Sequence, residues 1–548
     1  MRRARHDWLW GVLLAGGLGS LVYGLTQLSD EVGEQLGPLA VAPTSPPATA
    51  VSAHGVGTFQ NERPAEVTSP AAALCAGCDV VLITVCSLRR DHVGAYGEIP
   101  GLTPNLDKLL SGASRFERAY SASNFTLASL TAVFTGRFGS TTGVLGWDQG
   151  LQLNVPVLAE ILGIYGYRTG GFTIDAPSGF RPDYGLDRGF EHLEIMAPPR
   201  DTPDGRHVGG EPGPGGASAA PVAAWLDGLT GDQPVFIEHH NRSAHFPFVI
   251  QPDDGSDPTG ITQLLWDAGR DQNQSGPMPG TAGGTAQRGV VPLAGPDPLQ
   301  VAINEGKEPA VRMWAQRYAE SVRRMDVDMG VIGAALARRG RLDRTLLVFV
   351  ADHGESLNDH GELLHGDAYW DGVTRVPLLI KVPGVKGRVI RGLASHVDLL
   401  PTILELVGAQ PPAGIDGVSL SPLLLGKQEQ VREATFIEGG VTWRAGEVLR
   451  GAVVAPPWML MRQDAGCGPG SPPGAERPSR CLFNLEEDPG MAQDRARSEA
   501  KVVTELMERW EVYQRERTSA ARALELSPAY VEALRKTGYD FRPSDGGG

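Results

Sequence analysis

The chain has 548 residues, of which 41% are hydrophobic, and it carries a formal net charge of −15. This length accommodates one large domain and a smaller one, and the hydrophobic content is that of a globular protein. The negative charge argues against a general affinity for nucleic acids or anionic lipid surfaces, although a bound metal could reverse the field inside a local pocket.

The first predicted element is a targeting segment at residues 1–28. Arg2, Arg3 and Arg5 precede a stretch from Trp8 to Leu28 that contains no charged residue. Spanning a bilayer takes about 20 apolar residues, and basic residues before the span favour an N-terminus on the inside. We expect a signal anchor that holds the rest of the chain outside the membrane, in the periplasm or the extracellular space. A cleaved signal peptide is the alternative.

The remaining chain divides into a linker, a large domain and a small one. Residues 29–74 are rich in Pro, Ala, Ser and Thr, which predicts a flexible tether. From residue 75 to 426, strand-like runs alternate with amphipathic helices, which predicts an α/β domain whose mostly parallel sheet is sandwiched by helices. A polar, Gly- and Pro-rich insertion interrupts this domain at residues 253–308. Residues 427–548 predict a smaller C-terminal α+β subdomain.

Two apolar runs each lead directly into side chains that can bind a metal. Asp79–Val85 precedes Cys86, and Leu346–Ala351 precedes Asp352 and His353. Short β-branched runs without alternation predict strands that are buried on both faces of a parallel sheet. Ligands of open α/β sheets bind beyond the carboxyl ends of such strands. A carboxylate beside an imidazole at that place therefore predicts a divalent-metal site.

The clearest helical pattern covers residues 310–338. Tyr318 and Val322 recur at helical spacing, which predicts the buried stripe of a long amphipathic helix. Asp326 and Asp328 would then belong to a solvated or helix-pairing face.

An exported location would permit disulfides among the five cysteines. They are Cys75, Cys78, Cys86, Cys467 and Cys481. Cys467 and Cys481 flank a Gly/Pro-rich loop and could be bridged, whereas Cys75 and Cys78 could form a tight disulfide or remain two thiols. The odd count leaves one thiol over, and Cys86 is the candidate.

Several short motifs follow one another along the chain. They are DHVGAYG at 91–97, TPNLD at 103–107, FTGR at 134–137, DHGE at 352–355, RVPL at 375–378 and DLLPT at 398–402. Each motif alone is weak, but their order resembles the sulfatase family of the alkaline phosphatase superfamily. The resemblance implies an alkaline phosphatase-like fold and an enzyme that attacks an ester in line through a covalent intermediate.

By position in the family pattern, the nucleophile is Thr126. The residues after it predict a helix, so its hydroxyl would lie at a helix N-terminus, where unpaired amides favour an anionic ester. A bare threonine hydroxyl is a poor nucleophile, so a metal or a base must activate it. The alternative is that Thr126 only caps the helix.

Typical sulfatases carry a Cys-x-Pro-x-Arg motif whose cysteine is processed to formylglycine. Here the corresponding residues 126–130 read TLASL, so no formylglycine is expected. Residues 172–175 read FTID, where relatives often have Lys-x-His. A threonine nucleophile is similar instead to phosphate-handling relatives such as lipoteichoic acid synthases and phosphoethanolamine transferases.

The resemblance also implies a set of metal ligands: an acid after the first strand, the nucleophile and an Asp-His pair. Thr126, Asp352 and His353 match, but Cys86 occupies the position of the first acid. Hard ions such as calcium prefer oxygen, whereas a thiolate selects softer ions. We therefore expect one divalent ion, zinc or manganese rather than calcium. Cys86 could equally abolish the site, or be a small buried residue.

Three histidines and one arginine complete the expected site. His245, in HFPF, matches a family element whose histidine faces the substrate, and His365 lies where relatives place a histidine or lysine near the ester. We expect both to take part in catalysis, and His240 and Arg137 to bind substrate. Arg137 could instead support the fold by pairing with a carboxylate.

The sequence thus predicts a membrane-anchored hydrolase or transferase that acts on a sulfate or phosphate ester through a metal-activated Thr126. A rival prediction is a catalytically degenerate family member that binds a ligand or partner, since the first acid and the motif arginine and lysine are lost. No nucleic-acid partner is expected, and the sequence does not identify the substrate.

Overall fold

The structure is a computed structural model, and it describes residues 73–174, 179–196, 200–201, 207–208, 218–245, 308–365, 369–439, 450–462, 479–515 and 522–523. The predicted anchor at 1–28, all but the last two residues of the linker, and all but the last residue of the insertion at 253–308 lie outside these ranges. Among the helices in the described ranges, none has the length and apolar character that a membrane crossing requires.

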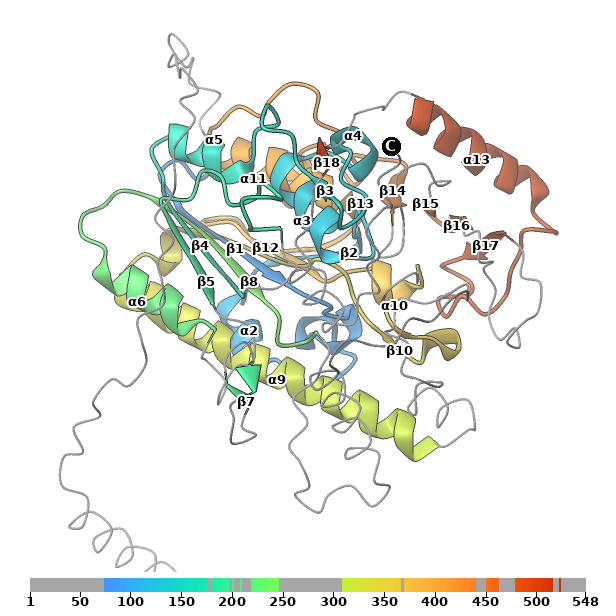
Figure 1. Ribbon diagram of the computed structural model, residues 1–548, viewed down its shortest axis with the longest axis horizontal. Coiled ribbons are helices and arrows are strands. Elements are labelled where there is room, and N and C mark those ends of the chain that lie inside the picture. Colours follow the sequence, from blue (N-terminus) through green and yellow to red (C-terminus); the bar gives the residue numbers. More distant parts are fainter. Residues whose placement is uncertain are drawn as a thin grey trace, which may run out of the picture. The chain divides into compact units, whose positions relative to one another are not determined.

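An eight-stranded sheet forms the centre of the fold (Figure 1), with the strand order β13-β2-β12-β9-β1-β8-β4-β5. β9, β1, β8, β4 and β5 are parallel to one another, and β13 is parallel to β2, whereas β12 is antiparallel to both of its neighbours. The predicted mostly parallel sheet is confirmed. Its strands are β1 Asp79–Val85, β2 Ser114–Tyr120, β4 Arg168–Ile174, β5 His192–Met196, β8 Val235–Asn241, β9 Thr345–Ala351, β12 Leu378–Lys381 and β13 Val389–Ser395.

Helices cover both faces of this sheet (Figure 1). On one side lie α2 Pro104–Leu109, α6 Ala220–Gly228 and the long α9 Glu308–Arg338, and on the other lie α3 Thr126–Thr135, α5 Leu158–Ile164 and α11 Leu399–Val407. The short elements are α4 Gly139–Thr142, α10 Asp371–Thr374, α12 Ser421–Leu424, η1 Arg90–His92, η2 Gly94–Tyr96, η3 Leu342–Arg344, η4 Asp359–Gly361, η5 His396–Asp398, and the strand pairs β3 Gln149–Gly150 with β18 Arg522–Ala523, β6 Arg200–Asp201 with β7 His207–Val208, and β10 Ser356–Leu357 with β11 Leu363–Leu364.

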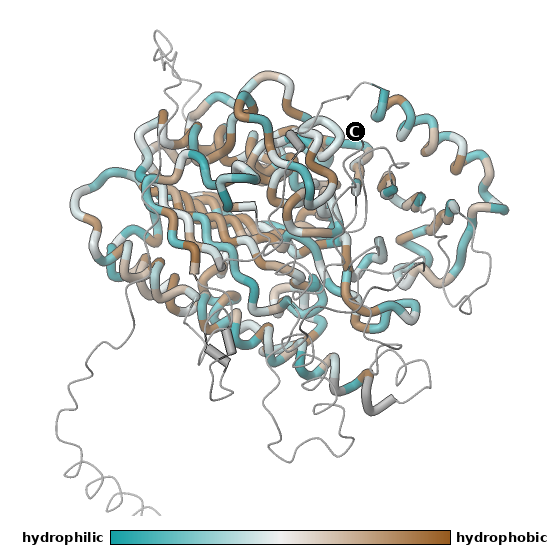
Figure 2. The backbone as a smooth tube through the Cα atoms, in the orientation of Figure 1, coloured by the Kyte–Doolittle hydropathy of each residue, from teal (hydrophilic) through white to brown (hydrophobic). Residues whose placement is uncertain are grey.

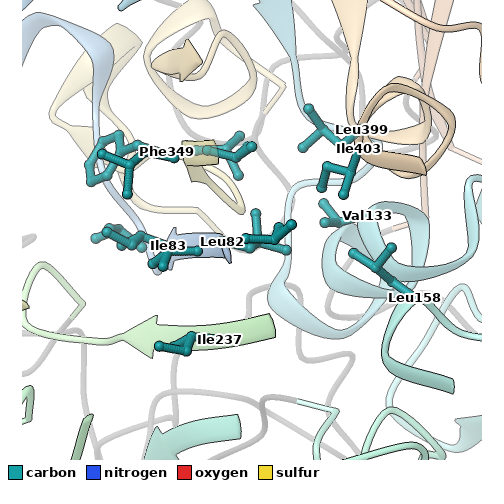
Figure 3. Packing of buried hydrophobic residues seen from close by; sticks show 14 of the residues in the cluster. Leu82, Ile83, Val133, Leu158, Ile237, Phe349, Leu399 and Ile403 are labelled. Carbon is teal, nitrogen blue, oxygen red and sulfur yellow. The ribbon is translucent and has the colours of Figure 1, made fainter. Parts of the chain in front are cut away.

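The core lies between the central strands and the helices. All seven residues of β1 and all seven of β9 are buried, which explains why their sequences are apolar on both faces apart from Asp79, Thr84 and Thr345. Figure 2 shows this concentration of hydrophobic residues along the central strands. In Figure 3, Leu82 of β1 and Val133, Leu158 and Leu399 of the covering helices contribute to one cluster. Burial of each such side chain stabilises the fold by about 1.5–3 kcal/mol.

The C-terminal region contains a four-stranded antiparallel sheet, as the predicted α+β subdomain requires. Its strands are β14 Thr435–Glu438, β15 Gly451–Ala455, β16 Trp458–Arg462 and β17 Arg480–Asn484. The helix α13 Ala500–Arg515 packs on one face of this sheet. Val453, Leu460 and Leu482 of the sheet pack with Leu506 and Trp510 of the helix. This second small core holds the sheet and the helix together.

The cysteines of the described residues occur in two states. Cys75 and Cys78 form a disulfide directly before β1. Cys86 is a free, buried thiol, as predicted. Cys481 is disulfide-bonded, and Cys467 lies outside the described residues.

Of the two alternatives for Asp326 and Asp328, a solvated or a helix-pairing face of α9, the structure confirms the second, since both residues are buried against neighbouring helices. Asp326 accepts hydrogen bonds from the backbone N–H groups of Asn105 and Leu106, at the start of α2. Asp328 accepts the N–H of Ala219, at the start of α6. The first N–H groups of a helix have no partner within the helix and attract a carboxylate. Helical spacing specifies a shared face but not which neighbour that face meets.

Candidate active site

Three side chains that can bind a metal converge at the carboxyl edge of the central strands. β1 and β9 pair in register at Val85 and Ala351, so the next residues, Cys86 and Asp352, lie side by side. His240 is the second-to-last residue of the neighbouring strand β8. The candidate ligand atoms of Cys86, His240 and Asp352 all lie within 4.8 Å of one another, and all three residues are buried.

The apolar run of β8 is followed by polar residues, but the strand continues through His239 and His240 to Asn241. Side chains alternate between the two faces of a strand. Adjacent histidines therefore point to opposite sides, and His240 points toward Thr84 of β1, at 2.8 Å.

The unpaired atoms of this cluster fit a divalent cation. Asp352 Oδ1 accepts the N–H groups of Ser87 and His353, at 3.1 and 2.6 Å. Asp352 Oδ2 and His240 Nε2, by contrast, are buried without a hydrogen-bond partner among the described residues. An unsatisfied buried polar group costs about 1–3 kcal/mol, so such atoms in a folded protein point to a ligand. Thiol, imidazole and carboxylate together are a donor set typical of zinc.

The hydrogen bonds of His240 leave the right atom available for a metal. Thr84 Oγ1 donates its single proton to Glu238 Oε1, at 2.6 Å. The same oxygen lies 2.8 Å from His240 Nδ1 and must accept the proton of that nitrogen. Nε2 of His240 therefore carries a lone pair. Such a partner on the second nitrogen fixes the tautomer of a metal-binding histidine.

Burial and neighbouring charges set the protonation of the cluster. Burial would raise the pKa of Asp352, but the adjacent imidazoles of His353 and His240 outweigh it, and the pKa lies below its usual value. Burial, with a smaller contribution from Asp352, raises the pKa of the Cys86 thiol far above its usual value. Burial also lowers the pKa of His240 to about 3. Without a cation, the cluster thus contains a carboxylate, a neutral thiol and a neutral imidazole.

Thr126 joins this cluster at the first residue of α3. Its Oγ1 lies 3.3 Å from Cys86 Sγ and 3.4 Å from His353 Nε2. The residue at the N-cap position is Phe125, so Thr126 is not the helix cap. The hydroxyl is buried at the helix N-terminus, where the sequence predicted it.

His353 contacts the Thr126 hydroxyl through a nitrogen that can accept a proton. Its Nδ1 lies 2.8 Å from the carbonyl oxygen of Gly354, which can only accept, so Nδ1 carries the proton and Nε2 the lone pair. Burial lowers the pKa of His353 to about 4, so the imidazole is neutral near pH 7. His353 Nε2 also lies 3.5 Å from Asp352 Oδ2.

The structure brings the other two predicted histidines to the same place. The ring of His365 lies 4.2 Å from that of His353 and 5.3 Å from that of His245, measured between centroids. His365 Nδ1 is 3.1 Å from Glu355 Oε1. Burial lowers the pKa of His365 to about 4 and raises that of Glu355 to about 8. Thr126, His353, His365 and His245 form a continuous row of side chains.

Comparison with known proteins agrees with this geometry. The model of the family described as Sulfatase matches residues 79–409, which is more than half of the chain. The chain belongs to the sulfatase family. Sulfatases are metal-dependent members of the alkaline phosphatase superfamily that hydrolyse sulfate or phosphate esters, so the predicted family and fold class are confirmed.

Individual sulfatases support the same assignment. Arylsulfatase A of Bos taurus is 29% identical over 477 residues, which cover 77% of this chain and 84% of that protein. A putative sulfatase from Bacteroides thetaiotaomicron superposes with a TM-score of 0.60 at 20% identity and covers 83% of this chain and 96% of its own. The phosphonate monoester hydrolase of Agrobacterium radiobacter has a TM-score of 0.57 at 19% identity, over 82% of this chain and 98% of its own. The two structures establish the fold, and the sulfatase relatives support a sulfuric ester hydrolase.

One expected sulfatase site residue does not reach the cluster. Arg137 follows the C-terminal end of α3, whereas Thr126 begins it, and ten helical residues span about 15 Å. The Arg137 guanidinium donates a hydrogen bond to the carbonyl oxygen of Ala413. The observed partner of Arg137 is thus a backbone carbonyl rather than a carboxylate, and its contact with the substrate stays a prediction.

Sequence reasoning missed three residues that border the site. Glu238 and Thr84 are polar residues inside otherwise apolar strands, and that interruption was a usable signal. Arg242 directly follows β8, and its Nη2 lies 3.1 Å from His245 Nδ1. Arg242 lies at this edge because β8 continues to Asn241.

Proposed function

We propose that this protein cleaves or transfers a sulfate or phosphate ester by nucleophilic attack of Thr126. One observation carries the proposal: Thr126 Oγ1 lies 3.4 Å from His353 Nε2, the nitrogen that carries a lone pair. Thr126 is the first residue of α3 and lies beside the Cys86–His240–Asp352 cluster. A nucleophile, a base that can take its proton and a set of metal-binding atoms thus meet at one point.

Cys86, His240 and Asp352 would hold one divalent ion there, and the thiolate favours zinc over calcium. Such an ion supplies Lewis-acid activation of the hydroxyl and of the ester oxygen. Coordination requires the deprotonated form of a thiol, so Cys86 would be a thiolate in the loaded protein.

His353 and a water molecule account for the proton transfers of the reaction, and His245 supplies a hydrogen bond. The Thr126 oxygen bonds to sulfur or phosphorus as the bond to the departing alcohol oxygen breaks. His353 Nε2 takes the threonine proton, while the departing oxygen accepts a hydrogen bond from His245 and takes its proton from water. The hydroxide that remains attacks the threonine ester and releases sulfate or phosphate, while His353 reprotonates Thr126. An alcohol in place of water makes the reaction a transfer.

The N-terminus of α3 favours the charge that develops during attack. The first turn of a helix leaves N–H groups without helical partners, and the helix dipole adds positive potential there. Both act on the anionic oxygens of an ester that faces Thr126. Because the helix is part of the buried core, this field is fixed before the substrate arrives.

The proposal is tested by Thr126→Ala, with Thr131→Ala as the control. Thr131 is a buried threonine of the same helix, whose hydroxyl donates to the carbonyl of Leu127 at 2.7 Å. We expect Thr126→Ala to lower kcat/KM for a nitrophenyl sulfate or phosphate by about 10³-fold or more and Thr131→Ala to keep it within about 10-fold. Equal activity of the two variants would contradict the proposal.

A second candidate function is ligand binding without turnover, favoured by the thiol in the position of the family acid. Cys86→Asp separates the two. If the pocket is otherwise intact and only the ligand was lost, this variant gains hydrolysis of a nitrophenyl ester. If the wild-type protein stays metal-free in excess zinc and manganese and does not turn over, the binding function stands.

We further propose that residues 1–28 anchor the protein, with residues 75–548 on the extracytoplasmic side. The basic flank, the uncharged stretch from Trp8 to Leu28 and the Cys75–Cys78 disulfide support this, because disulfides persist in oxidising compartments. After alkaline carbonate extraction the protein should stay with the membranes. Its release into the supernatant would contradict the anchor.

A further inference from the structure

Arg242 is a cation whose counter-charge is missing from the described structure. It directly follows β8 and is half-buried. Four other buried or half-buried arginines each contact a carboxylate: Arg89 with Asp91, Arg341 with Asp79, Arg375 with Asp371, and Arg432 with Asp398. Among the described residues, Arg242 has no such carboxylate, and its one polar contact is His245. Charges withdrawn from water are normally paired, so a guanidinium in this position points to an anionic ligand.

Contact with Arg242 also fixes the tautomer of His245. Arg242 Nη2 lies 3.1 Å from His245 Nδ1. A guanidinium has only donors, so Nδ1 must accept, and neutral His245 carries its proton on Nε2. The pair therefore carries one positive charge and one N–H donor. Both are features that the anionic oxygens and the leaving oxygen of an ester require.

Arg242 belongs spatially to the proposed active site. His245 is 5.3 Å from His365, which is 4.2 Å from His353, whose Nε2 contacts Thr126 Oγ1 at 3.4 Å. The guanidinium also acts electrostatically on Cys86, His240 and His365. An ester that contacts Thr126 at one end of this row therefore lies within the field of Arg242.

Counting charges indicates the kind of ester that fits. A divalent ion is balanced by a Cys86 thiolate and the Asp352 carboxylate. Glu355 is engaged with His365 at 3.1 Å. The charge of Arg242 is then left for the substrate. One negative charge balances it, whereas a second would remain uncompensated in a buried site, which is costly.

We propose that Arg242 binds an anionic oxygen of the ester and selects ester groups with one negative charge, namely sulfate monoesters and phosphate diesters. This rests on the proposed function. Arg242 thereby supplies the positive charge that the absent arginine and lysine of the family motifs would have given, from a different strand end.

Binding of two unreactive analogues tests the proposal without turnover. Benzenesulfonate carries one negative charge and phenylphosphonate two at pH 8, on the same phenyl group. Calorimetry on the zinc-treated full chain, with zinc content recorded, should show benzenesulfonate binding at least about 10-fold more tightly. Arg242→Gln should weaken benzenesulfonate about 10- to 100-fold, and Arg242→Lys should keep part of the affinity because it keeps the charge. Near-UV circular dichroism of each variant checks that it is folded.

Arg338→Gln is the matched control, since Arg338 lies at the exposed end of α9 and pairs with Asp227 at 2.8 Å. It should bind both analogues as the wild-type protein does. If folded Arg242→Gln binds as tightly as this control, or if the wild-type protein prefers phenylphosphonate, the proposal is overturned. Binding of these analogues requires no nucleophilic attack, so the result is independent of whether Thr126 is the nucleophile.

Turnover then separates contact with substrate from structural support. The substrates are 4-nitrophenyl sulfate, bis(4-nitrophenyl) phosphate and 4-nitrophenyl phosphate, and the first two should be preferred. Arg242→Gln should lower kcat/KM for the preferred ester by about 10²-fold, largely through KM, and added guanidinium ion should restore part of it. The sulfate and the diester distinguish the two singly charged classes. Failure of guanidinium to restore activity, with KM unchanged, would leave Arg242 without a role in substrate binding.

Discussion

Buried carboxylates lie at both ends of the strand pair β1–β9, and they differ in how their oxygens are hydrogen-bonded. At the start of the strand, Asp79 Oδ1 accepts the N–H of Val235 at 3.0 Å, and Oδ2 accepts the Arg341 guanidinium at 2.7 Å. Beyond its end, Asp352 Oδ2 and His240 Nε2 are buried without a hydrogen-bond partner among the described residues. Asp79 and Asp352 are equally buried. Burial therefore does not separate a structural acid from a functional one, whereas the pairing of its oxygens does.

The same contrast holds for cations. Arg341 is enclosed with Asp79, while Arg242 lacks a carboxylate among the described residues. A satisfied pair contributes to the stability of the fold and offers nothing to a ligand. An unsatisfied group destabilises the fold, and ligand binding removes that penalty. Substitutions at the two ends of β1 should therefore have opposite consequences.

The largest expected effect is that of Asp352→Asn. Removing the carboxylate should abolish stoichiometric zinc and lower kcat/KM by about 10³-fold or more, since the metal and its orientation are lost together. The free energy of unfolding of the metal-free protein should fall less than in Asp79→Asn, because no buried cation is left without its counter-ion. Mass spectrometric metal analysis and urea unfolding measure the two effects. Strong destabilisation of the metal-free protein would make Asp352 resemble Asp79 and break the contrast.

Asp79→Asn should do the reverse. It leaves the Arg341 guanidinium buried without its counter-ion, and breaking a buried pair costs about 3–5 kcal/mol. The free energy of unfolding from urea titration should fall by that order, while zinc content of the folded protein is retained. An unchanged urea midpoint would show that the Asp79–Arg341 pair does not stabilise the fold.

Thr84→Val tests the support of His240 with a nearly isosteric change. Without the hydroxyl, the imidazole loses the acceptor for its Nδ1 proton, and loss of such a partner weakens metal binding about 10- to 100-fold. Competition with a chromophoric chelator would measure zinc affinity. Affinity equal to that of the wild-type protein would exclude a role for the Glu238–Thr84–His240 chain.

The smallest effect concerns pH and His396. Its Nδ1 accepts the N–H of Ala122, at 3.3 Å, and its Nε2 donates to the carbonyl of Ala351, at 2.9 Å, so the ring must be neutral. Burial lowers its pKa to about 4. The stability this group provides is complete above its unfolded pKa, about 6.5, and is lost as pH falls toward 4, because the unfolded state binds a proton there that the folded state does not.

His396→Gln, whose amide can replace both hydrogen bonds, should therefore flatten the dependence of unfolding free energy on pH. The expected decrease in slope between pH 6 and 4.5 is about 1.4 kcal/mol per pH unit. Urea unfolding of the metal-free protein at several pH values measures it. A slope that does not change would mean that His396 titrates alike in both states.

Parts of this molecule could be predicted from sequence because their physical cause is local. Asp79–Val85 was predicted with the bounds of β1, and the long helix, expected at 310–338, begins at Glu308. In both cases the sequence pattern reflects which residues of a single strand or helix are buried. His239 and His240 can be buried in β8 because side chains of other strands and helices contact their rings. The sequence pattern of β8 alone does not show those contacts.

The sequence predicted which residues form the site better than how they are arranged in space. Family position identified Thr126, Cys86, Asp352 and His353, which the structure brings together. The pairing register of β8, β1 and β9 places His240, rather than His353, in the triad with Cys86 and Asp352. The position of Arg242 relative to the site depends on where β8 ends, and the position of Arg137 depends on the length of α3. Strand register and helix length are tertiary properties that no single motif carries.

The sulfur of Cys86 has a consequence for where and when such a site can be filled. An all-oxygen cage would be occupied by whichever hard cation is most abundant in the surroundings. A cage with a thiolate depends instead on the scarce borderline metals, for which cells and their neighbours compete. Replacement of one acid by Cys86 would thus couple this protein to trace-metal nutrition, so that its occupancy rises and falls with zinc supply.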